Sequence, residues 1–156
     1  MTKQEIDESF PNLATCPTTF STFRRVGGYS ITSPEAIEYN CIAWVAGDTE
    51  AWWWPDPLYQ YYWPPEIPRA VAIKAFVKAF KLLGYSVCED AGYENDFEKI
   101  AIYADSNGNP THAARQLDTG KWTSKLGRLE DIEHTDLDSI INPTYGTPVV
   151  YLKRHK

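Results

Sequence analysis

Apolar positions recur at helical spacing between residues 69 and 84, which makes this segment the clearest helix in the chain. The lysines in the segment fall on the opposite face from the apolar side chains. The apolar face comprises Val71, Ala75, Phe76, Ala79, Phe80 and Leu83. Gly84 suits the end of this helix, because glycine readily adopts the left-handed conformation that closes a last turn. The pattern predicts an amphipathic helix over 69–84 that packs on a core.

A second helix is predicted over 33–47. Ser33 is a good N-cap, proline after it suits the first helical position, and Gly47 can end the helix. Cys41 then lies two turns into this helix. A break near Tyr39 and Asn40 would instead start a new helix at Cys41. The two alternatives differ chemically, because a helix N-terminus favours a thiolate and a mid-helix position does not.

Short alternating segments separated by turn residues dominate the region 97–156. The predicted strands are FEKIAIYAD, THAARQLD, KWTSKLG and PVVYLKR, and the turn signals SNGNP and TG separate the first three. The acidic stretch RLEDIEHTDLDSI before the last strand is predicted to be an inserted helix. The expected fold class is therefore α+β, with N-terminal helices packed on a small antiparallel β-sheet.

Two further segments lack a regular pattern. Residues 1–32 are predicted to be an extended segment lying over the core. Residues 51–68 contain WWWPDPLYQYYWPPEIP, which is too rich in proline for regular structure and too aromatic for a free linker. We expect 51–68 to be an ordered aromatic loop, and 1–156 to form a single domain.

The composition narrows the possible functions. The net charge of −6 disfavours nucleic acid as a partner, and the three cysteines are too few and too scattered for a disulfide framework. Tight metal-ligand spacing and a phosphate-binding glycine loop are both missing, so no metal and no cofactor are expected. Without a signal peptide or a membrane-spanning apolar run, the protein is expected in the cytoplasm, with no membrane partner. Delivery by a specialised secretion route remains compatible with this.

The candidate chemistry centres on Cys41. Cysteine catalysis requires a thiol, a histidine that takes its proton, a group that orients the imidazole, and donors for the developing oxyanion. Cys41 provides the thiol and His112, at the start of a predicted strand, provides the base. Ser124, Lys125 or a nearby backbone carbonyl would orient the imidazole.

The remaining cysteines and histidines have simpler interpretations. Cys16 and Cys88 are expected to be small buried hydrophobic side chains. His134, in the acidic stretch, is interpreted as a helix-surface or capping group, with a role as an alternative base left open. His155 lies in the tail.

The order of a cysteine in YNCIAWVAG, a histidine strand THAARQL and a polar strand KWTSKLG resembles the papain-like fold. It is most similar to the compact bacterial branch with the NlpC-type and CHAP-type cell-wall amidases and peptidases. The resemblance implies that Cys41, followed by the aromatic Trp44, is the nucleophile and His112 the base. Ser124 and Lys125 stand where that branch commonly has His, Asn, Asp or Gln. The stretch from NCIAWVAGD to LEDIEH also resembles an uncharacterised bacterial family of small stand-alone proteins.

These observations predict a thiol hydrolase, a cysteine peptidase or amidase that acts on an amide bond of a peptide or protein. Transamidation or deamidation would use the same residues. Catalysis is assigned to Cys41, His112 and Ser124. The side chains expected to bind substrate are Asn40, Trp44, Trp53, Trp54, Trp63 and Lys125. The alternative is a catalytically inactive binding module that uses the aromatic loop as the surface for a protein partner.

Overall fold

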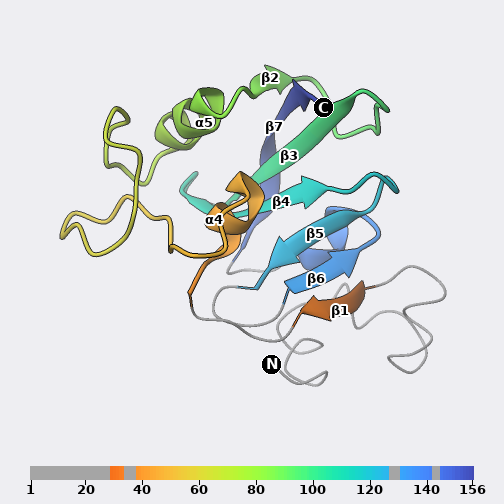
Figure 1. Ribbon diagram of the computed structural model, residues 1–156, viewed down its shortest axis with the longest axis horizontal. Helices are drawn as coiled ribbons and strands as arrows, with labels where there is room; N and C mark the ends of the chain where they lie inside the picture. The colour runs from red at the N-terminus through yellow and green to blue at the C-terminus, as the bar shows by residue number, and fades with distance from the viewer. Residues whose placement is uncertain (1–28, 34–37, 127–130, 142–144) are drawn as a thin grey trace.

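The computed structural model describes residues 29–33, 38–126, 131–141 and 145–156 (Figure 1). Within them the chain forms a seven-stranded sheet in which every neighbouring pair is antiparallel. The strand order is β1 (Tyr29–Ser33), β6 (Asp131–His134), β5 (Trp122–Lys125), β4 (Pro110–Gln116), β3 (Phe97–Ala104), β7 (Thr147–His155) and β2 (Ser86–Cys88). Helices α4 (Cys41–Ala46) and α5 (Ile73–Leu82) and the short 3-10 helix η1 (Asp138–Ile140) complete the described elements. The predicted α+β class with an antiparallel sheet is confirmed.

The sheet separates two hydrophobic clusters. Successive strand residues point to opposite faces, so neighbours on β4 belong to different clusters. Ala113 packs with Ile42 of α4 and Phe76 of α5. Ala114 packs with Trp122 and with Ile140 of η1. Figure 1 shows α4 lying across β4 and β5, the strands it contacts most.

Helix α5 occupies the centre of the segment 69–84. Its buried face is Ala75, Phe76, Ala79 and Phe80. Val71 precedes the helix and is 39% exposed, so it does not belong to the apolar face to which its spacing assigned it. Gly84 has a φ of 94° and follows the helix end, in agreement with a glycine-closed terminus.

The prediction of one helix over 33–47 is wrong. Ser33 is the last residue of β1, where its backbone pairs with Asp131, and α4 begins only at Cys41. Asn40 is the N-cap, and Gly47, with a φ of 83°, closes the other end. The chain therefore breaks before Cys41, and residues 34–37 lie outside the described part.

The prediction of an inserted acidic helix is also wrong. Residues 131–134 form β6, which pairs with β5 on one side and with β1 on the other. The reason is a period of two: Ile132 and His134 share one face, and Asp131 and Glu133 share the other. Of the rest of that stretch, 138–140 form the single 3-10 turn η1, and residues 127–130 lie outside the described part.

The region 97–156 does not make the sheet alone. Strand β1 supplies one edge and overlaps the end of the predicted extended segment 1–32, whose residues 1–28 lie outside the described part. Strand β2 supplies the other edge, where Cys88 pairs with Tyr151.

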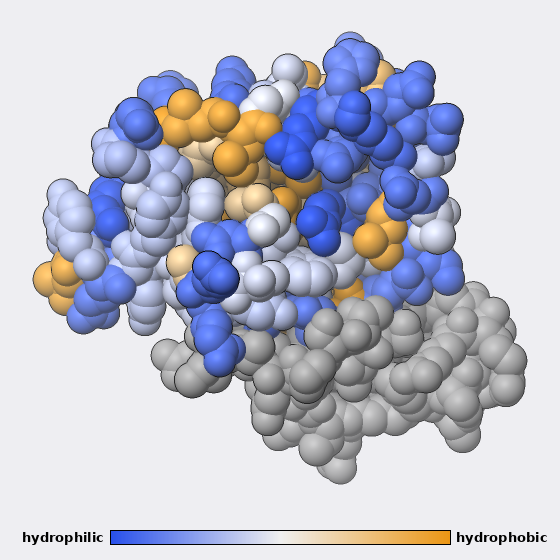
Figure 2. All heavy atoms as spheres, viewed as in Figure 1, coloured by the Kyte–Doolittle hydropathy of each residue, from blue (hydrophilic) through white to orange (hydrophobic). Residues whose placement is uncertain are grey.

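Residues 51–68 contain neither helix nor strand and form the predicted ordered loop. An isolated parallel β-bridge between Trp53 and Tyr62 joins the two arms of the loop. Arg69 donates to the Asp56 carboxylate over 2.9 Å and to the carbonyl oxygen of Tyr61 over 2.8 Å. The loop projects from the left side of the molecule, and Figure 2 shows apolar atoms over its outer end.

Two further observations concern membrane-spanning helices and the cysteines. None of the helices in the described ranges has the length and apolar content required to cross a bilayer. Cys41 and Cys88 are both free thiols. Cys16 lies outside the described residues.

Candidate functional site

Cys41 is held at the start of α4 by the residue before it. The side-chain oxygen of Asn40 accepts hydrogen bonds from the N–H groups of Ala43 and Trp53, each over 3.1 Å. Its amide nitrogen donates to the carbonyl oxygen of Trp53 over 2.8 Å. Asn40 therefore caps the helix and fastens it to the aromatic loop, and both its polar atoms are engaged within the protein.

The Cys41 side chain is 6% exposed. Burial raises the pKa of the thiol to about 11, against the opposing effect of backbone N–H groups of Ala113, Ile42 and Cys41 itself, which point at the sulfur. The positive charge of Lys125 also opposes the rise. The thiol is consequently protonated at neutral pH, and a base must take its proton before the sulfur can act as a nucleophile.

A chain of buried hydrogen bonds crosses three neighbouring strands on the other face of the sheet. His112 Nε2 on β4 lies 3.0 Å from Ser124 Oγ on β5. The same oxygen lies 2.8 Å from His134 Nε2 on β6. His134 Nδ1 lies 2.7 Å from the backbone carbonyl oxygen of Asp136. The three side chains are no more than 1% exposed, so this polar chain is enclosed by protein.

His112 has one unused ring atom. Its Nδ1 has no hydrogen-bond partner among the described residues, although the side chain is fully buried. Tyr145 stacks on the ring with centroids 4.2 Å apart and an interplanar angle of 8°, and Tyr103 meets it edge-on at 5.2 Å. Burial, with His134 nearby, holds the pKa of His112 well below its usual range. A buried polar atom without a partner is rare enough to need an explanation, and a catalytic role is one of the known ones.

The thiol and the imidazole lie on opposite faces of the sheet but close to the same peptide bond of β4. The Ala113 N–H that points at the Cys41 sulfur belongs to the peptide bond that follows His112. Tyr145, which stacks on His112, also interacts electrostatically with Cys41. The His112 ring lies on the Tyr103 face of the sheet, whereas α4 packs on the opposite face. No hydrogen bond joins Cys41 to His112 in the described structure, and the two side chains extend from opposite faces of the sheet.

Comparison of the chain with known protein families gives a match. A family model described as "Domain of unknown function (DUF7689)" matches residues 30–153. The chain belongs to the DUF7689 family. The matched region includes Cys41, His112, Ser124 and His134. No curated protein and no solved structure matches the chain.

In this DUF7689 domain, three of the predicted substrate-binding tryptophans pack within the protein. Trp53 and Trp63 are 8% and 4% exposed, and Trp63 packs against Phe76 with ring centroids 5.0 Å apart. Trp54 meets the same phenylalanine edge-on at 5.4 Å. Trp54 and Trp63 therefore join the aromatic loop to α5, and Trp53 packs on Tyr62 within the loop.

The other two predicted binding residues lie beside β5. Trp44 is partly exposed, and its indole N–H donates to Thr123 Oγ1 over 3.2 Å. Lys125 is fully buried with its amine 5.1 Å from the centre of the Tyr39 ring. Both lie on the α4 side of the sheet, next to Cys41 rather than next to Ser124. A substrate contact for either stays a prediction.

Two residues around the candidate site were not assigned to it from the sequence. The sequence favours a helix-surface or capping group for His134, because acidic residues surround it, and leaves a role as an alternative base open. The signal that could have placed it is the alternation in DIEH, which puts Ile132 and His134 on one face of a strand. Tyr145 carries no such signal, because it lies in a turn before β7 and reaches His112 only through the tertiary fold.

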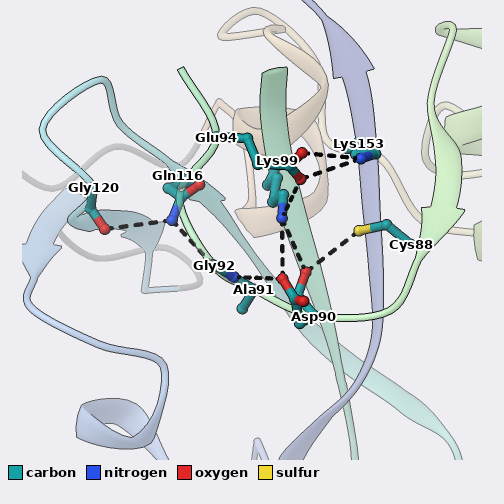
Figure 3. Close-up of polar contacts among 9 residues, drawn as sticks. All are labelled: Cys88, Asp90, Ala91, Gly92, Glu94, Lys99, Gln116, Gly120 and Lys153. Atoms are coloured by element: carbon teal, nitrogen blue, oxygen red, sulfur yellow. Dashed lines mark hydrogen bonds and ion pairs between the residues drawn. The ribbon is translucent and has the colours of Figure 1, made fainter. Parts of the chain in front are cut away.

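A second polar cluster, drawn in Figure 3, lies around Lys99 at the other end of the sheet. The Lys99 side chain is 1% exposed and pairs with Asp90 over 3.3 Å and with Glu94 over 2.8 Å. The Cys88 thiol donates to the Asp90 carbonyl oxygen over 3.4 Å, and Lys153 contacts Glu94. Because the two lysines are paired with Asp90 and Glu94, we interpret the cluster as a structural ion-pair network that holds β2, β3 and β7 together.

Proposed function

We propose that this DUF7689 protein is a thiol hydrolase that acts on an amide bond, with Cys41 as nucleophile and His112 as base. The observation that carries the proposal is the buried Nδ1 of His112, which has no partner among the described residues and belongs to the residue just before Ala113, whose N–H points at the Cys41 sulfur. The opposite ring nitrogen is held by Ser124 at 3.0 Å. The resemblance to papain-like peptidases and amidases supports the same assignment by analogy of arrangement.

The proposed reaction conserves protons and electron pairs at each step. Nδ1 of His112 takes the thiol proton as the Cys41 sulfur bonds to the amide carbon, and the carbonyl π electrons move to oxygen. Collapse of this intermediate breaks the carbon–nitrogen bond, and the imidazolium gives its proton to the leaving amine. Water then attacks the thioester with His112 again as base, releasing a carboxylic acid and the thiol. An amine in place of water would give transamidation.

The surroundings suit this sequence of steps in two ways. Ser124 holds Nε2 of the imidazole, which fixes the ring and leaves Nδ1 as the nitrogen that would exchange protons. Backbone N–H groups that point at the sulfur are placed to stabilise negative charge at the reacting centre. The 6% exposure of Cys41 means that the neighbouring side chains must move aside before a substrate carbonyl reaches the sulfur.

Acyl transfer from 4-nitrophenyl acetate tests this assignment without knowledge of the natural substrate. We expect the folded wild-type protein to acquire one acetyl group as a thioester on Cys41, located by peptide mass spectrometry, and to lose it again by hydrolysis. His112→Ala should slow acetylation by about 10²-fold or more, because it removes the general base. Cys41→Ala should abolish it.

The matched control is Cys88→Ala, which removes the more exposed of the two described thiols and should leave the acetylation rate unchanged. Acetylation that follows exposure, with Cys88 modified first and no dependence on His112, would contradict the proposal. Circular dichroism of each variant shows whether a loss of rate reflects a loss of fold.

A second candidate function, a binding module, is favoured by the tip of the aromatic loop. Leu58 and Tyr59 are 73% and 77% exposed at the end of a segment that Arg69 and Asp56 brace. Tyr59 has a φ of 56°, a conformation that costs energy for a residue other than glycine and is often kept at functional sites. A rigid tip with two large apolar side chains is suited to insertion into a pocket of a protein partner.

This candidate predicts that crosslinked partners are lost when the tip is made polar. Leu58→Ser combined with Tyr59→Ser should abolish capture of a specific protein, whereas Leu82→Ser should not. Leu82 is the matched control, since it is also apolar and 54% exposed but lies on α5. Equal capture by all three proteins, measured by quantitative mass spectrometry, would remove the loop tip as a binding surface.

A further inference from the structure

The far end of the buried hydrogen-bond chain determines the positions of its protons. A backbone carbonyl oxygen can only accept a hydrogen bond. The His134 nitrogen that lies 2.7 Å from the Asp136 carbonyl oxygen, Nδ1, must therefore carry a proton. Burial lowers the pKa of His134 to about 4, so the ring is neutral at pH 7 and has only this one proton. Its Nε2 is then an acceptor.

The direction of the next two hydrogen bonds follows from this. Because His134 Nε2 accepts, the Ser124 hydroxyl proton must point toward it across the 2.8 Å contact. The Ser124 oxygen has no second proton, so it accepts from His112 Nε2 across the 3.0 Å contact. His112 is also neutral, because burial lowers its pKa. Its proton therefore lies on Nε2, and its lone pair lies on Nδ1.

We propose that His134 is a positioning residue that, through Ser124, sets the tautomer of His112 so that Nδ1 is the basic nitrogen. The nitrogen left as acceptor is the one without a partner in the described structure. In the reverse arrangement, a proton would occupy Nδ1 and His112 could not receive the Cys41 proton there. The tautomer follows from the hydrogen-bond geometry of two buried, neutral rings, whereas its catalytic use rests on the function proposed above.

Nitrogen NMR of the 156-residue chain, labelled with ¹⁵N-histidine, tests the tautomers directly at pH 7. Two-bond proton–nitrogen correlations distinguish the protonated from the bare nitrogen in each ring. We expect opposite tautomers: His112 protonated on Nε2 and His134 protonated on Nδ1. Spectra of His155→Gln and His134→Gln assign the three histidines. A wild-type His112 protonated on Nδ1 would overturn the proposal without any further variant.

Two substitutions at one position separate positioning from simple packing. His134→Leu removes the acceptor, so Ser124 is free to donate to His112 Nε2 and should shift the His112 proton to Nδ1. His134→Gln places an amide oxygen where Nε2 lies and should keep the wild-type tautomer. If both variants leave the His112 tautomer unchanged, His134 does not set it. If His134→Leu does not fold, Ser124→Ala breaks the same chain at its centre.

The acetylation assay completes the test and keeps the two proposals distinct. His134→Leu should slow acetylation of Cys41 at least tenfold, and His134→Gln should restore most of the rate. Opposite tautomers without acetylation of Cys41 would refute the thiol hydrolase and leave the positioning role intact. Acetylation of Cys41 with a His112 proton on Nδ1 would support the thiol hydrolase and refute the positioning role of His134.

Discussion

Replacing Gly146 by alanine is expected to destabilise the protein by about 4 kcal/mol or to prevent folding. Gly146 has a φ of 72°, and a β-carbon there would overlap the carbonyl oxygen of Ala104 and lie 2.9 Å from the Cα atom of Asp105. Those contacts are with backbone, which cannot rotate away as a side chain can. The end of β7 would have to separate from β3, and Tyr145 would leave the His112 ring on which it stacks.

Gly108→Ala is the matched control for this substitution. Gly108 has a φ of 82°, but a β-carbon there meets no atom within 4 Å. It should therefore cost only about 1 kcal/mol, the conformational penalty of a left-handed alanine. Chemical denaturation of both variants measures the difference. Equal losses of the free energy of unfolding would show that the close approach of Gly146 to β3 does not exist in solution.

Acid should weaken the fold between pH 6.5 and about 4, before most carboxylates are protonated. The folded-state pKa of His134 is lowered from 6.5 to about 4, mainly by burial, and that of His112 is also lowered. The unfolded chain therefore binds more protons, so this stability is fully present above pH 6.5 and is lost as the pH falls toward the folded pKa. For His134 alone the shift corresponds to about 3 kcal/mol.

Denaturation curves recorded at half-unit steps of pH check this expectation. His134→Gln cannot titrate and should show a shallower loss over the same range. The pKa values of Asp48 and Asp56 are lowered from 3.8 by hydrogen bonds that their carboxylates accept, so these groups should contribute only at lower pH. A free energy of unfolding that stays level from pH 6.5 to 4 would contradict the buried, neutral state of the two histidines.

Local patterns were sufficient to predict the elements whose partners lie nearby in the chain. Helix α5 follows from its apolar spacing, and the β3–β4 hairpin follows from alternation around the SNGNP turn. Asn40 and Cys41 were assigned together as a possible helix start, and the cap was found there. In each case the residue pattern that predicts the element is local in the sequence.

The errors arose where distant segments decide the structure. Ser33 looks like a helix cap, but pairing with β6, roughly a hundred residues later, makes it the end of a strand. The acidic residues around His134 favour a helix by composition. The segment is nevertheless a strand, because its backbone pairs with β5 on one side and with β1 on the other. The same long-range placement brings His134 to Ser124, which is why this one of the three side chains in the polar chain is not assigned to it from the sequence.

The strand order also fixes when the fold can form during synthesis. Tyr29 pairs with His134, and Cys88 pairs with Tyr151. Both edge strands can therefore pair only after residues much later in the sequence have been synthesised. At a translation rate of about 5–20 residues per second, β1 remains unpaired for roughly 5–20 s after it is made. The nascent chain thus starts from its central hairpin and closes outward, and β6, the strand that brings His134 to Ser124, is among the last to be translated.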